Sequence, residues 1–171
     1  MRLSRAGLVV SLSLSIASVS SAQPAPQVAS LGSCPLQNGG TIINCRVAYR
    51  TFGRLNPGHS NGVLRTVGFQ GRTAAPVPTV PQTAYLANVD TTRFFLVIVD
   101  ALGNGASSSP SNSSEQPGGQ FPNYTIRDMV NSQYRLLTEH LHISHLHAVL
   151  GPSMGGMQAF EWAVAYPDYV D

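Results

Sequence analysis

Lysine is absent from the sequence, and charges of either sign are scarce. All ten basic residues are arginine, eight residues are Asp or Glu, and charged residues make up only 11% of the chain. Without a run of basic residues, the chain lacks the electrostatic footprint of a nucleic-acid-binding protein. Beyond residue 22 there is no apolar stretch long enough for a transmembrane helix. The composition therefore argues against nucleic acid as a partner and against a membrane span in the mature chain.

The first 22 residues differ in character from the rest of the sequence. They carry Arg2 and Arg5 near the start, continue as an apolar and serine-rich stretch too short to cross a bilayer comfortably, and end in Ser-Ser-Ala. This pattern is typical of a secretory signal cleaved after Ala22, and an uncleaved membrane anchor is the alternative. Cleavage removes two of the ten arginines, so that eight remain in residues 23–171 to balance the eight acidic residues. We therefore expect a secreted or periplasmic protein with a formal charge near zero.

Cysteine is nearly absent as well, since Cys34 and Cys45 are the only two. In an exported protein such a pair favours a disulfide, which would close a short loop and contribute about 2–3 kcal/mol. Two buried free thiols are the alternative. No histidine is close to either cysteine in the sequence, and two thiols alone make a poor zinc site. We therefore expect neither a metal site nor a cofactor.

The hydrophobic pattern alternates between short apolar strands and helices. Residues 94–99 form an apolar run without a polar face, which is typical of a strand buried in a parallel sheet. Residues 125–141 repeat apolar side chains at helical spacing behind Thr125, a good N-cap residue with Asp128 three positions later. The pattern predicts an α/β fold with a mostly parallel sheet and flanking helices. The expected elements are strands at 34–36 and 42–52 around a turn at 37–40, a strand at 63–69, a short helix at 84–87, a strand at 94–99, a helix at 125–141, a strand at 146–150 and a helix that ends at 166.

Three segments carry weaker signals. Residues 42–52 alternate between two faces, as an antiparallel strand near a sheet edge does. Residues 23–33, with two prolines, are expected to form a loose N-terminus. Residues 101–122 are rich in Gly, Ser, Asn and Pro, and a loop of this length is usually either functional or disordered. Composition alone favours low-complexity flexibility for this loop.

The most informative stretch is 148–157, which reads Ala-Val-Leu-Gly-Pro-Ser-Met-Gly-Gly-Met. A short apolar strand leads into Gly-Pro-Ser-Met-Gly and a helix, in the order of the G-x-S-x-G nucleophile elbow. The glycines provide room, because side chains at Gly151 and Gly155 would collide across so tight a turn. Ser153 is then the candidate nucleophile, and the N–H of Met154, at the head of the helix, is a candidate oxyanion donor.

A Gly-Ser loop between two elements is the alternative interpretation of this stretch. The context favours the elbow, since apolar strand residues come immediately before the serine and Pro167 stands where a helix should end. An apolar face at helical spacing follows the serine, formed by Met157, Phe160, Ala163 and Val164.

A second oxyanion donor is expected in the loop that follows the strand at 63–69. A loop with a flexible glycine, here Gly71, can turn a backbone N–H toward the oxyanion. Phe69 and Gln70 are the candidate donors. An ordinary turn at the end of a strand is the alternative.

Longer motifs show a family resemblance. Residues 125–130 read Thr-Ile-Arg-Asp-Met-Val, residues 153–158 read Ser-Met-Gly-Gly-Met-Gln, and residues 161–163 read Glu-Trp-Ala. With shorter matches over residues 47–171, they resemble homoserine O-acetyltransferases and their relatives in the α/β-hydrolase superfamily. The resemblance implies an α/β-hydrolase fold in which Ser153 takes an acyl group from a small-molecule ester or thioester and passes it to an acceptor. It leaves a homodimer open.

The sequence departs from this family because no candidate base follows the serine. A serine hydroxyl needs a general base, and in this superfamily an acidic residue and a histidine follow the serine in chain order. After Ser153 the sequence has three acidic residues and no histidine. Asp100 comes before the serine in the sequence and is expected to have a structural role or to anchor a loop. None of the five histidines is expected to be the base, namely His59, His140, His142, His145 and His147.

Three hypotheses about function follow. The first is that residues 23–171 are the N-terminal part of an exported serine-dependent hydrolase or acyltransferase, which ends before the acid and the base. Such a fragment is expected to be nearly inactive alone and to expose an apolar sheet edge. The second is a CoA-dependent homoserine O-acetyltransferase proper, which requires a cytosolic location because acetyl-CoA is cytosolic. The third is a non-catalytic binding protein of the same fold. The export signal favours the first over the second.

Overall fold

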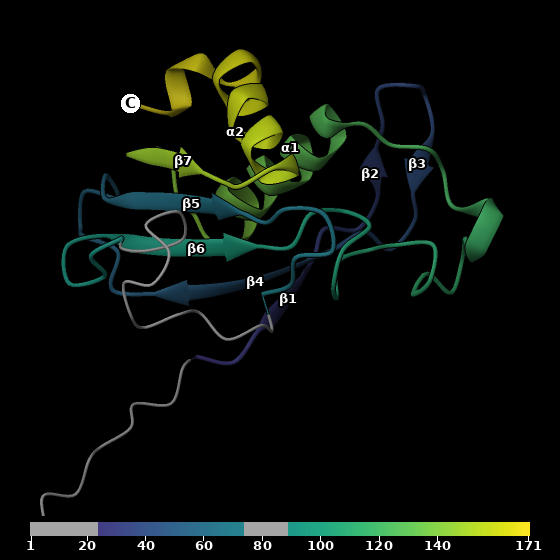
Figure 1. The fold of residues 1–171 in the computed structure, drawn as a ribbon, viewed down its shortest axis with the longest axis horizontal. Helices are drawn as coiled ribbons and strands as arrows, with labels where there is room; N and C mark the ends of the chain where they lie inside the picture. The colour runs from purple at the N-terminus through teal and green to yellow at the C-terminus, as the bar shows by residue number, and fades with distance from the viewer. Residues whose placement is uncertain (1–23, 74–88) are drawn as a thin grey trace, which may run out of the picture.

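A five-stranded sheet forms the centre of the fold in the computed structural model, which describes residues 24–73 and 89–171 (Figure 1). Its strands are β1 (Gln27–Ser30), β4 (Arg46–Phe52), β5 (Gly62–Thr66), β6 (Phe95–Val99) and β7 (Ala148–Leu150). The order across the sheet is β1-β4-β6-β5-β7. β4 is antiparallel to β1 and β6, whereas β5 is parallel to β6 and β7. Every strand of this sheet except β4 therefore runs in the same direction, which confirms the mostly parallel sheet. The predicted signal at 1–22 and the predicted helix at 84–87 lie outside the described residues.

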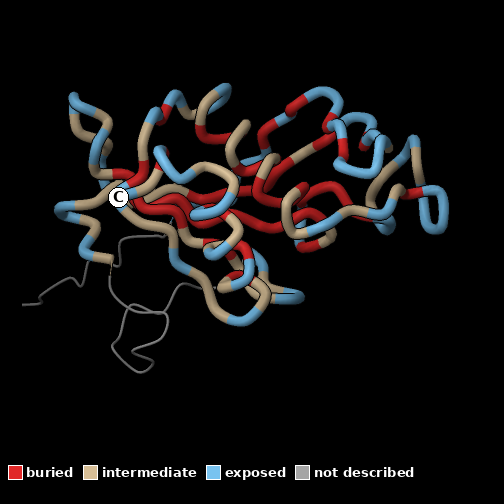
Figure 2. Tube along the Cα trace, turned by 90° about the horizontal axis from the view of Figure 1, so that it is seen from above, coloured by how far each residue is buried: buried red, intermediate tan, exposed pale blue. Residues whose placement is uncertain are grey.

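Helices α1 (Ile126–Arg135) and α2 (Met154–Ala165) cover one face of this sheet (Figure 1). The Thr125 side chain accepts from the N–H of Asp128, and the Asp128 carboxylate accepts from the N–H of Thr125, so the expected cap is present. A π-helical turn, η2 (Leu136–His140), extends α1, and short 3₁₀ turns lie at η1 (Gly118–Gln120) and η3 (Pro167–Tyr169). The buried residues gather along the central strands, and the core also includes residues of both helices (Figure 2). In the described ranges no helix has the length and apolar character that crossing a bilayer requires.

The N-terminal segment differs from the expectation of a loose terminus. Residues 27–30 form β1, which pairs with β4 from Gln27↔Tyr49 to Ser30↔Arg46. β4 is therefore antiparallel to both neighbours and lies next to the edge strand, as predicted, and it has buried residues on both of its faces. Four residues are too few to show a periodic pattern of their own, so only the pairing with β4 reveals this strand.

Two strand boundaries also differ from the sequence-based expectation. β5 ends at Thr66 instead of residue 69, because residues 68–71 form a turn. β7 begins at residue 148 instead of 146, since Leu146 forms an isolated parallel bridge with Val170.

The expected hairpin and disulfide are both present near the N-terminus. β2 (Cys34–Pro35) pairs with β3 (Thr41–Ile42), and a disulfide joins Cys34 to Cys45. The second strand of the hairpin is shorter than expected, because Asn44 adopts a positive φ of 51° and turns the chain before β4 begins.

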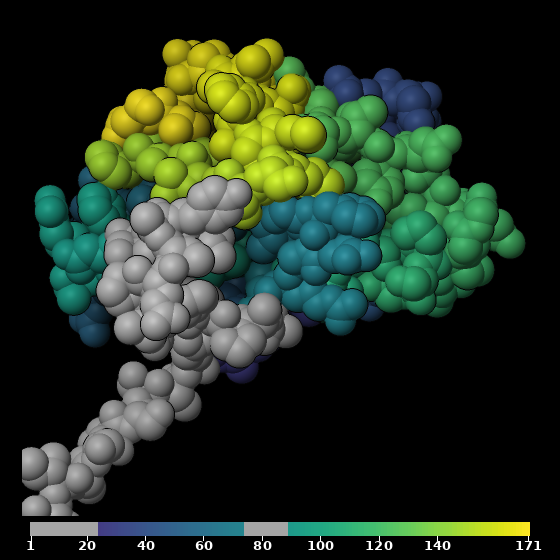
Figure 3. Space-filling view, in the orientation of Figure 1, coloured from purple at the N-terminus to yellow at the C-terminus, as the bar shows by residue number. Residues whose placement is uncertain are grey.

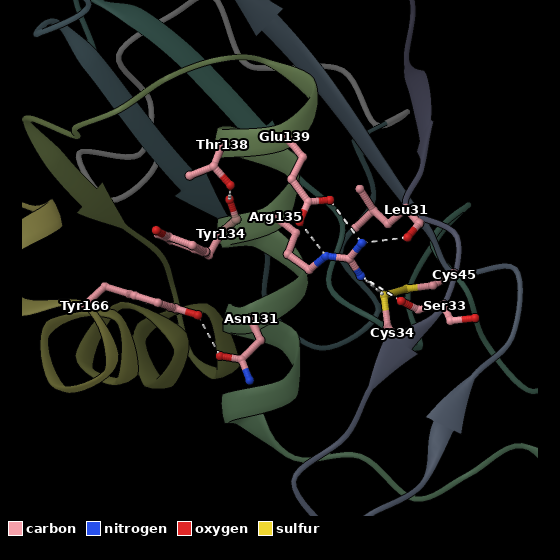
Figure 4. A network of polar contacts seen from close by, with 10 residues as sticks. All are labelled: Leu31, Ser33, Cys34, Cys45, Asn131, Tyr134, Arg135, Thr138, Glu139 and Tyr166. Atoms are coloured by element: carbon pink, nitrogen blue, oxygen red, sulfur yellow. Dashed lines mark hydrogen bonds and ion pairs between the residues drawn. A yellow bond between two sulfur atoms is a disulfide. The ribbon is translucent and has the colours of Figure 1, made fainter.

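Arg135, at the end of α1, joins the residues that lead into this disulfide to the helix layer (Figure 4). Its guanidinium donates to the carbonyl oxygens of Leu31 at 2.7 Å and Ser33 at 2.8 Å. It also pairs with Glu139 one turn later at 2.8 Å and holds the pKa of that carboxyl below its usual range. The residues before Cys34 are thus held to α1 by hydrogen bonds, and the disulfide ties Cys34 to Cys45, the residue before β4.

The serine-rich segment 101–122 packs against the start of β4. The hydroxyl of Ser107 accepts the N–H of Ala48 at 2.9 Å, and the hydroxyl of Ser108 accepts the N–H of Arg46 at 2.9 Å. The N–H of Ser108 donates in turn to the carbonyl of Arg46 at 2.9 Å. The composition that favoured low-complexity flexibility therefore supplies hydrogen-bond partners for a buried strand.

The apolar face predicted on α2 exists, but it is exposed. Met157, Phe160 and Val164 are 61%, 81% and 68% exposed, whereas the buried residues of this helix are Gly155, Gln158 and Trp162. In Figure 3 this last part of the chain, in yellow, forms the outer surface above the sheet. Leu150 on the edge strand β7 is also 45% exposed. An exposed apolar patch of this kind marks a surface suited to contact with further protein.

Candidate active site

Ser153 lies at the turn between β7 and α2, and it is exposed. Its backbone has φ 52° and ψ −122°. A residue other than glycine rarely adopts a positive φ, and strained conformations of this kind concentrate at functional sites. The serine occupies the N-cap position of α2, yet its side chain makes no capping hydrogen bond. The hydroxyl is therefore not committed to the helix that follows it.

The two glycines of the motif have no room for a side chain. A Cβ on Gly151 would collide with Thr66 Oγ1 and would lie 2.5 Å from both the carbonyl carbon and the oxygen of Gly155. A Cβ on Gly155 would lie 2.9 Å from the backbone oxygen of Thr66 and 3.0 Å from its hydroxyl. The collision across the turn that the sequence suggested is therefore observed, and β5 takes part in it.

Thr66, at the end of β5, was not singled out by the sequence analysis. Its side chain is fully buried, and its hydroxyl lies 2.8 Å from the carbonyl oxygen of Gly155 and 3.2 Å from that of Leu150. The hydroxyl therefore joins the central sheet to both sides of the serine turn. No local pattern in the sequence could have identified it, because its partners are more than 80 positions away.

The chain after β5 forms a turn beside the serine. A backbone hydrogen bond of 2.9 Å closes the turn over residues 68–71, with Phe69 and Gln70 at its centre. A Cβ on Gly68 would lie 3.7 Å from the Cβ of Ser153, so the two segments approach closely. The ordinary turn named as the alternative is therefore present, and it lies against the candidate nucleophile.

Asn104 supports this turn from the neighbouring loop. Its side-chain amide donates to the carbonyl of Gly68 at 2.9 Å and accepts from the N–H of Gln70 at 3.3 Å, while Gln70 has a positive φ of 61°. The N–H of Gln70 thus has a partner. Within residues 24–73 and 89–171 the N–H of Phe69 donates no hydrogen bond, which favours Phe69 of the two candidates.

Met154 is the first residue of α2, where a backbone N–H has no acceptor within the helix and the helix dipole is positive. No acidic residue lies in the first turn of α2 to neutralise that dipole. The exposed side of the turn at Ser153 is therefore suited to a developing negative charge.

No histidine of the described chain makes a hydrogen bond with Ser153. Their polar contacts are His59 with the carbonyl of His142 at 2.9 Å, His140 with the hydroxyl of Tyr49 at 3.1 Å, and His145 and His147 with Asp171 at 2.7 and 2.9 Å. The two histidines on Asp171 hold the pKa of that carboxyl below its usual range. Within the described residues, no histidine is therefore placed by a hydrogen bond to act as the base of Ser153. In the same ranges no cluster of three or more His, Cys, Asp or Glu side chains could hold a metal ion.

Asp100 anchors loops, in agreement with the expectation from sequence. It is buried at the end of β6 and accepts the N–H of Thr73 at 2.5 Å and that of Ala106 at 3.3 Å. Burial raises the pKa of this carboxyl, although the two N–H donors oppose the effect. Asp100 therefore connects the loop after the 68–71 turn to the segment that follows β6.

The strand order, the serine turn and its two glycines indicate the class of protein, an α/β-hydrolase fold. A family model described as alpha/beta hydrolase fold matches residues 80–171, more than half of the chain, and the chain belongs to this family. An ethyl acetate hydrolase of Pseudomonas veronii is 35% identical over 148 residues, which cover 84% of this chain and 41% of that protein. A homoserine O-acetyltransferase of Haemophilus influenzae is 38% identical over 148 residues, covering 80% and 41%.

A solved structure agrees with these similarities. An acetylester hydrolase from Corynebacterium glutamicum superposes with a TM-score of 0.74 at 34% identity, covering 85% of this chain and 42% of that one. The chain therefore spans about two-fifths of the length of the relatives it matches.

Proposed function

We propose that this protein is a serine-dependent acyl-transfer enzyme that forms an acyl-enzyme on Ser153. The proposal rests on one observation, the strained backbone of Ser153 at a strand–turn–helix junction with the 68–71 turn beside it. The names of the relatives, an ethyl acetate hydrolase and a homoserine O-acetyltransferase, support the reaction class.

In the first half of the reaction, Ser153 Oγ attacks the carbonyl carbon of a small acyl ester or thioester while its proton passes to a general base. The N–H groups of Met154 and Phe69 donate to the oxyanion of the tetrahedral intermediate. The bond to the alcohol or thiol then breaks, and that group leaves with the proton from the base. Water or a second alcohol attacks the acyl-serine in the same way and regenerates the hydroxyl.

We propose that the base and the acid that orients it belong to a part of the protein outside these 171 residues. No histidine of the described chain reaches Ser153, and the relatives are more than twice as long as the aligned segment. The exposed face of Met157, Phe160 and Val164 offers an apolar surface on which further elements can pack. The 171 residues alone are then expected to turn over very slowly.

Hydrolysis of small esters is the favoured form of the reaction, because the signal-like residues 1–22 direct the protein away from cytosolic CoA. Acetyl transfer from CoA to homoserine is the second candidate, favoured by the resemblance of residues 153–158. Sequencing the N-terminus of the natural protein separates the two. A mature chain that starts at Gln23 supports export, and a retained Met1 on protein found in the cytosolic fraction supports the transferase.

The test of the nucleophile uses the complete gene product and a fluorophosphonate probe. The probe should label wild-type protein at Ser153, and Ser153→Ala should abolish both the label and the hydrolysis of p-nitrophenyl acetate. Ser114→Ala is the matched control, since Ser114 is also exposed. Labelling that survives in Ser153→Ala would show that the nucleophile is another residue.

A further inference from the structure

Three buried side chains form a continuous polar chain beneath the candidate site. Gln133 of α1 and Gln158 and Trp162 of α2 are all fully buried. The indole N–H of Trp162 donates to Gln133 Oε1 at 2.8 Å, and Gln133 Nε2 donates to Gln158 Oε1 at 2.5 Å. Buried amides without partners would destabilise the fold, so the mutual hydrogen bonds explain how two glutamines are tolerated in the core.

The groups at the two ends of this series of hydrogen bonds, the Trp162 indole and two backbone carbonyls, fix the direction of every bond between them. The indole of Trp162 can only donate, so Gln133 must present its oxygen to it and its NH₂ group to Gln158. Gln158 therefore accepts through its oxygen, and its own NH₂ group faces the other way. There it donates to two backbone carbonyls, which can only accept, at 3.2 Å each. Only one orientation of each amide satisfies all the partners.

The two carbonyls belong to the two segments that carry the proposed oxyanion donors. One is the carbonyl of Val67, two residues before Phe69, and the other is that of Met154 itself. A single amide group thus binds the loop after β5 and the first turn of α2 together. The separation of the two donor N–H groups depends on how these two segments sit relative to each other.

We propose that Gln158 is a positioning residue that sets the distance between the two oxyanion donors. The inference rests on the proposed function, because it presupposes that Met154 and Phe69 donate to an oxyanion. Gln158 contacts no substrate and acts through the backbone of Val67 and Met154. Gln133 donates only to the oxygen of Gln158 and does not contact the loop, whereas the two carbonyls, which can only accept, hold the NH₂ group of Gln158 in place.

The test compares Gln158→Met with Gln133→Met in the complete gene product. Methionine matches the length of glutamine but donates no hydrogen bond, and only the first substitution frees the Val67 carbonyl. With enzyme concentration set by the amount of serine that a fluorophosphonate labels, Gln158→Met should lower kcat for p-nitrophenyl acetate by about 10–100-fold. Its KM, and both constants of Gln133→Met, should change by less than about threefold.

A merely structural role predicts other results. Both variants would then lose thermal stability and yield of labelled enzyme to a similar extent, with kcat per labelled serine unchanged or lowered equally in the two. Either result overturns the inference. Turnover that survives in Ser153→Ala would instead refute the proposed function, so the two failures are distinguishable.

Gln158→Glu provides a second measurement if the methionine variant does not fold. An ionised carboxylate would face two carbonyl oxygens, whereas a protonated carboxyl can donate to one of them. Since burial raises the pKa of such a carboxyl, kcat relative to wild type should rise as the pH falls from about 8 to about 5. A ratio that stays constant over this range would contradict the role of the donated hydrogen bonds.

Discussion

Replacing Gly151 by alanine is expected to disrupt the serine turn more than any other small substitution in it. The new Cβ would lie 2.5 Å from the carbonyl carbon and oxygen of Gly155, and it would collide with the hydroxyl of Thr66. The first turn of α2 has to shift as backbone, because no flexible side-chain end can move aside. Overpacking of this kind costs about 1–3 kcal/mol, and losing the buried hydrogen bond of Thr66 adds about 1 kcal/mol.

The same substitution at two neighbouring glycines provides the controls. A Cβ on Gly155 meets Thr66 at 2.9 and 3.0 Å, which predicts an intermediate cost. A Cβ on Gly156 meets a single atom, the carbonyl oxygen of Gly151, at 3.2 Å. The gain in helix propensity of up to about 1 kcal/mol should offset that contact, so Gly156→Ala should be close to neutral.

The assay measures urea unfolding midpoints and the rate of fluorophosphonate labelling in the complete gene product. The expected order of stability is wild type and Gly156→Ala, then Gly155→Ala, then Gly151→Ala, with labelling of Ser153 lost in the last. If Gly156→Ala proved as costly as Gly151→Ala, or if Gly151→Ala kept the wild-type midpoint and labelling rate, the packing argument would be refuted.

Three further predictions concern the surroundings of the site. Replacing Cys34 and Cys45 together by alanine removes a disulfide between residues separated by 11 positions and should lower the free energy of unfolding by about 3 kcal/mol. Urea unfolding without reductant measures this loss, and an unchanged midpoint would contradict it. Thr66→Val should lower the free energy of unfolding by about 1–2 kcal/mol and slow the labelling of Ser153 by the probe. Thr66→Ser keeps the hydroxyl and should keep the labelling rate, so equal slowing in both variants would argue against a role of the hydroxyl. Burial raises the pKa of Asp100 in the folded state above its ordinary value of 3.8. The contribution of Asp100 to stability is therefore fully present below pH 3.8 and is lost as the pH rises through the folded-state pKa. The stability of wild type relative to Asp100→Asn, from urea midpoints, should therefore fall with rising pH above 4, and a rise would show that the sign is wrong.

The part of the site that could be predicted from the sequence depends on residues close together in the chain. A serine between two glycines, behind a short strand and ahead of a helix, predicts the turn, since the collision that excludes side chains there acts over five residues. The cap at Thr125 and Asp128 is local in the same sense, and so is the disulfide-closed loop. The continuous apolar run at 94–99 predicted a buried strand because both of its faces are covered.

Tertiary structure decided the features whose partners are distant in the sequence. β1 is a strand because β4 lies beside it, and the serines of 101–122 serve β4 from about 60 positions away. The choice between Phe69 and Gln70 depends on Asn104, which no pattern near either residue reveals.

The helix α2 shows the limit of periodicity most directly. Its spacing predicted one apolar face, but a spacing does not say which side meets the sheet. In the fold, the side with Gln158 and Trp162 is buried, because their hydrogen bonds with Gln133 satisfy the polar groups, and the apolar side faces outward. The sequence by itself determined the serine turn and the order of strand and helix around it, since both arise from neighbouring residues. Only the tertiary structure decided which side of α2 is buried and which side chains support the turn, because those interactions join residues that are far apart in the chain.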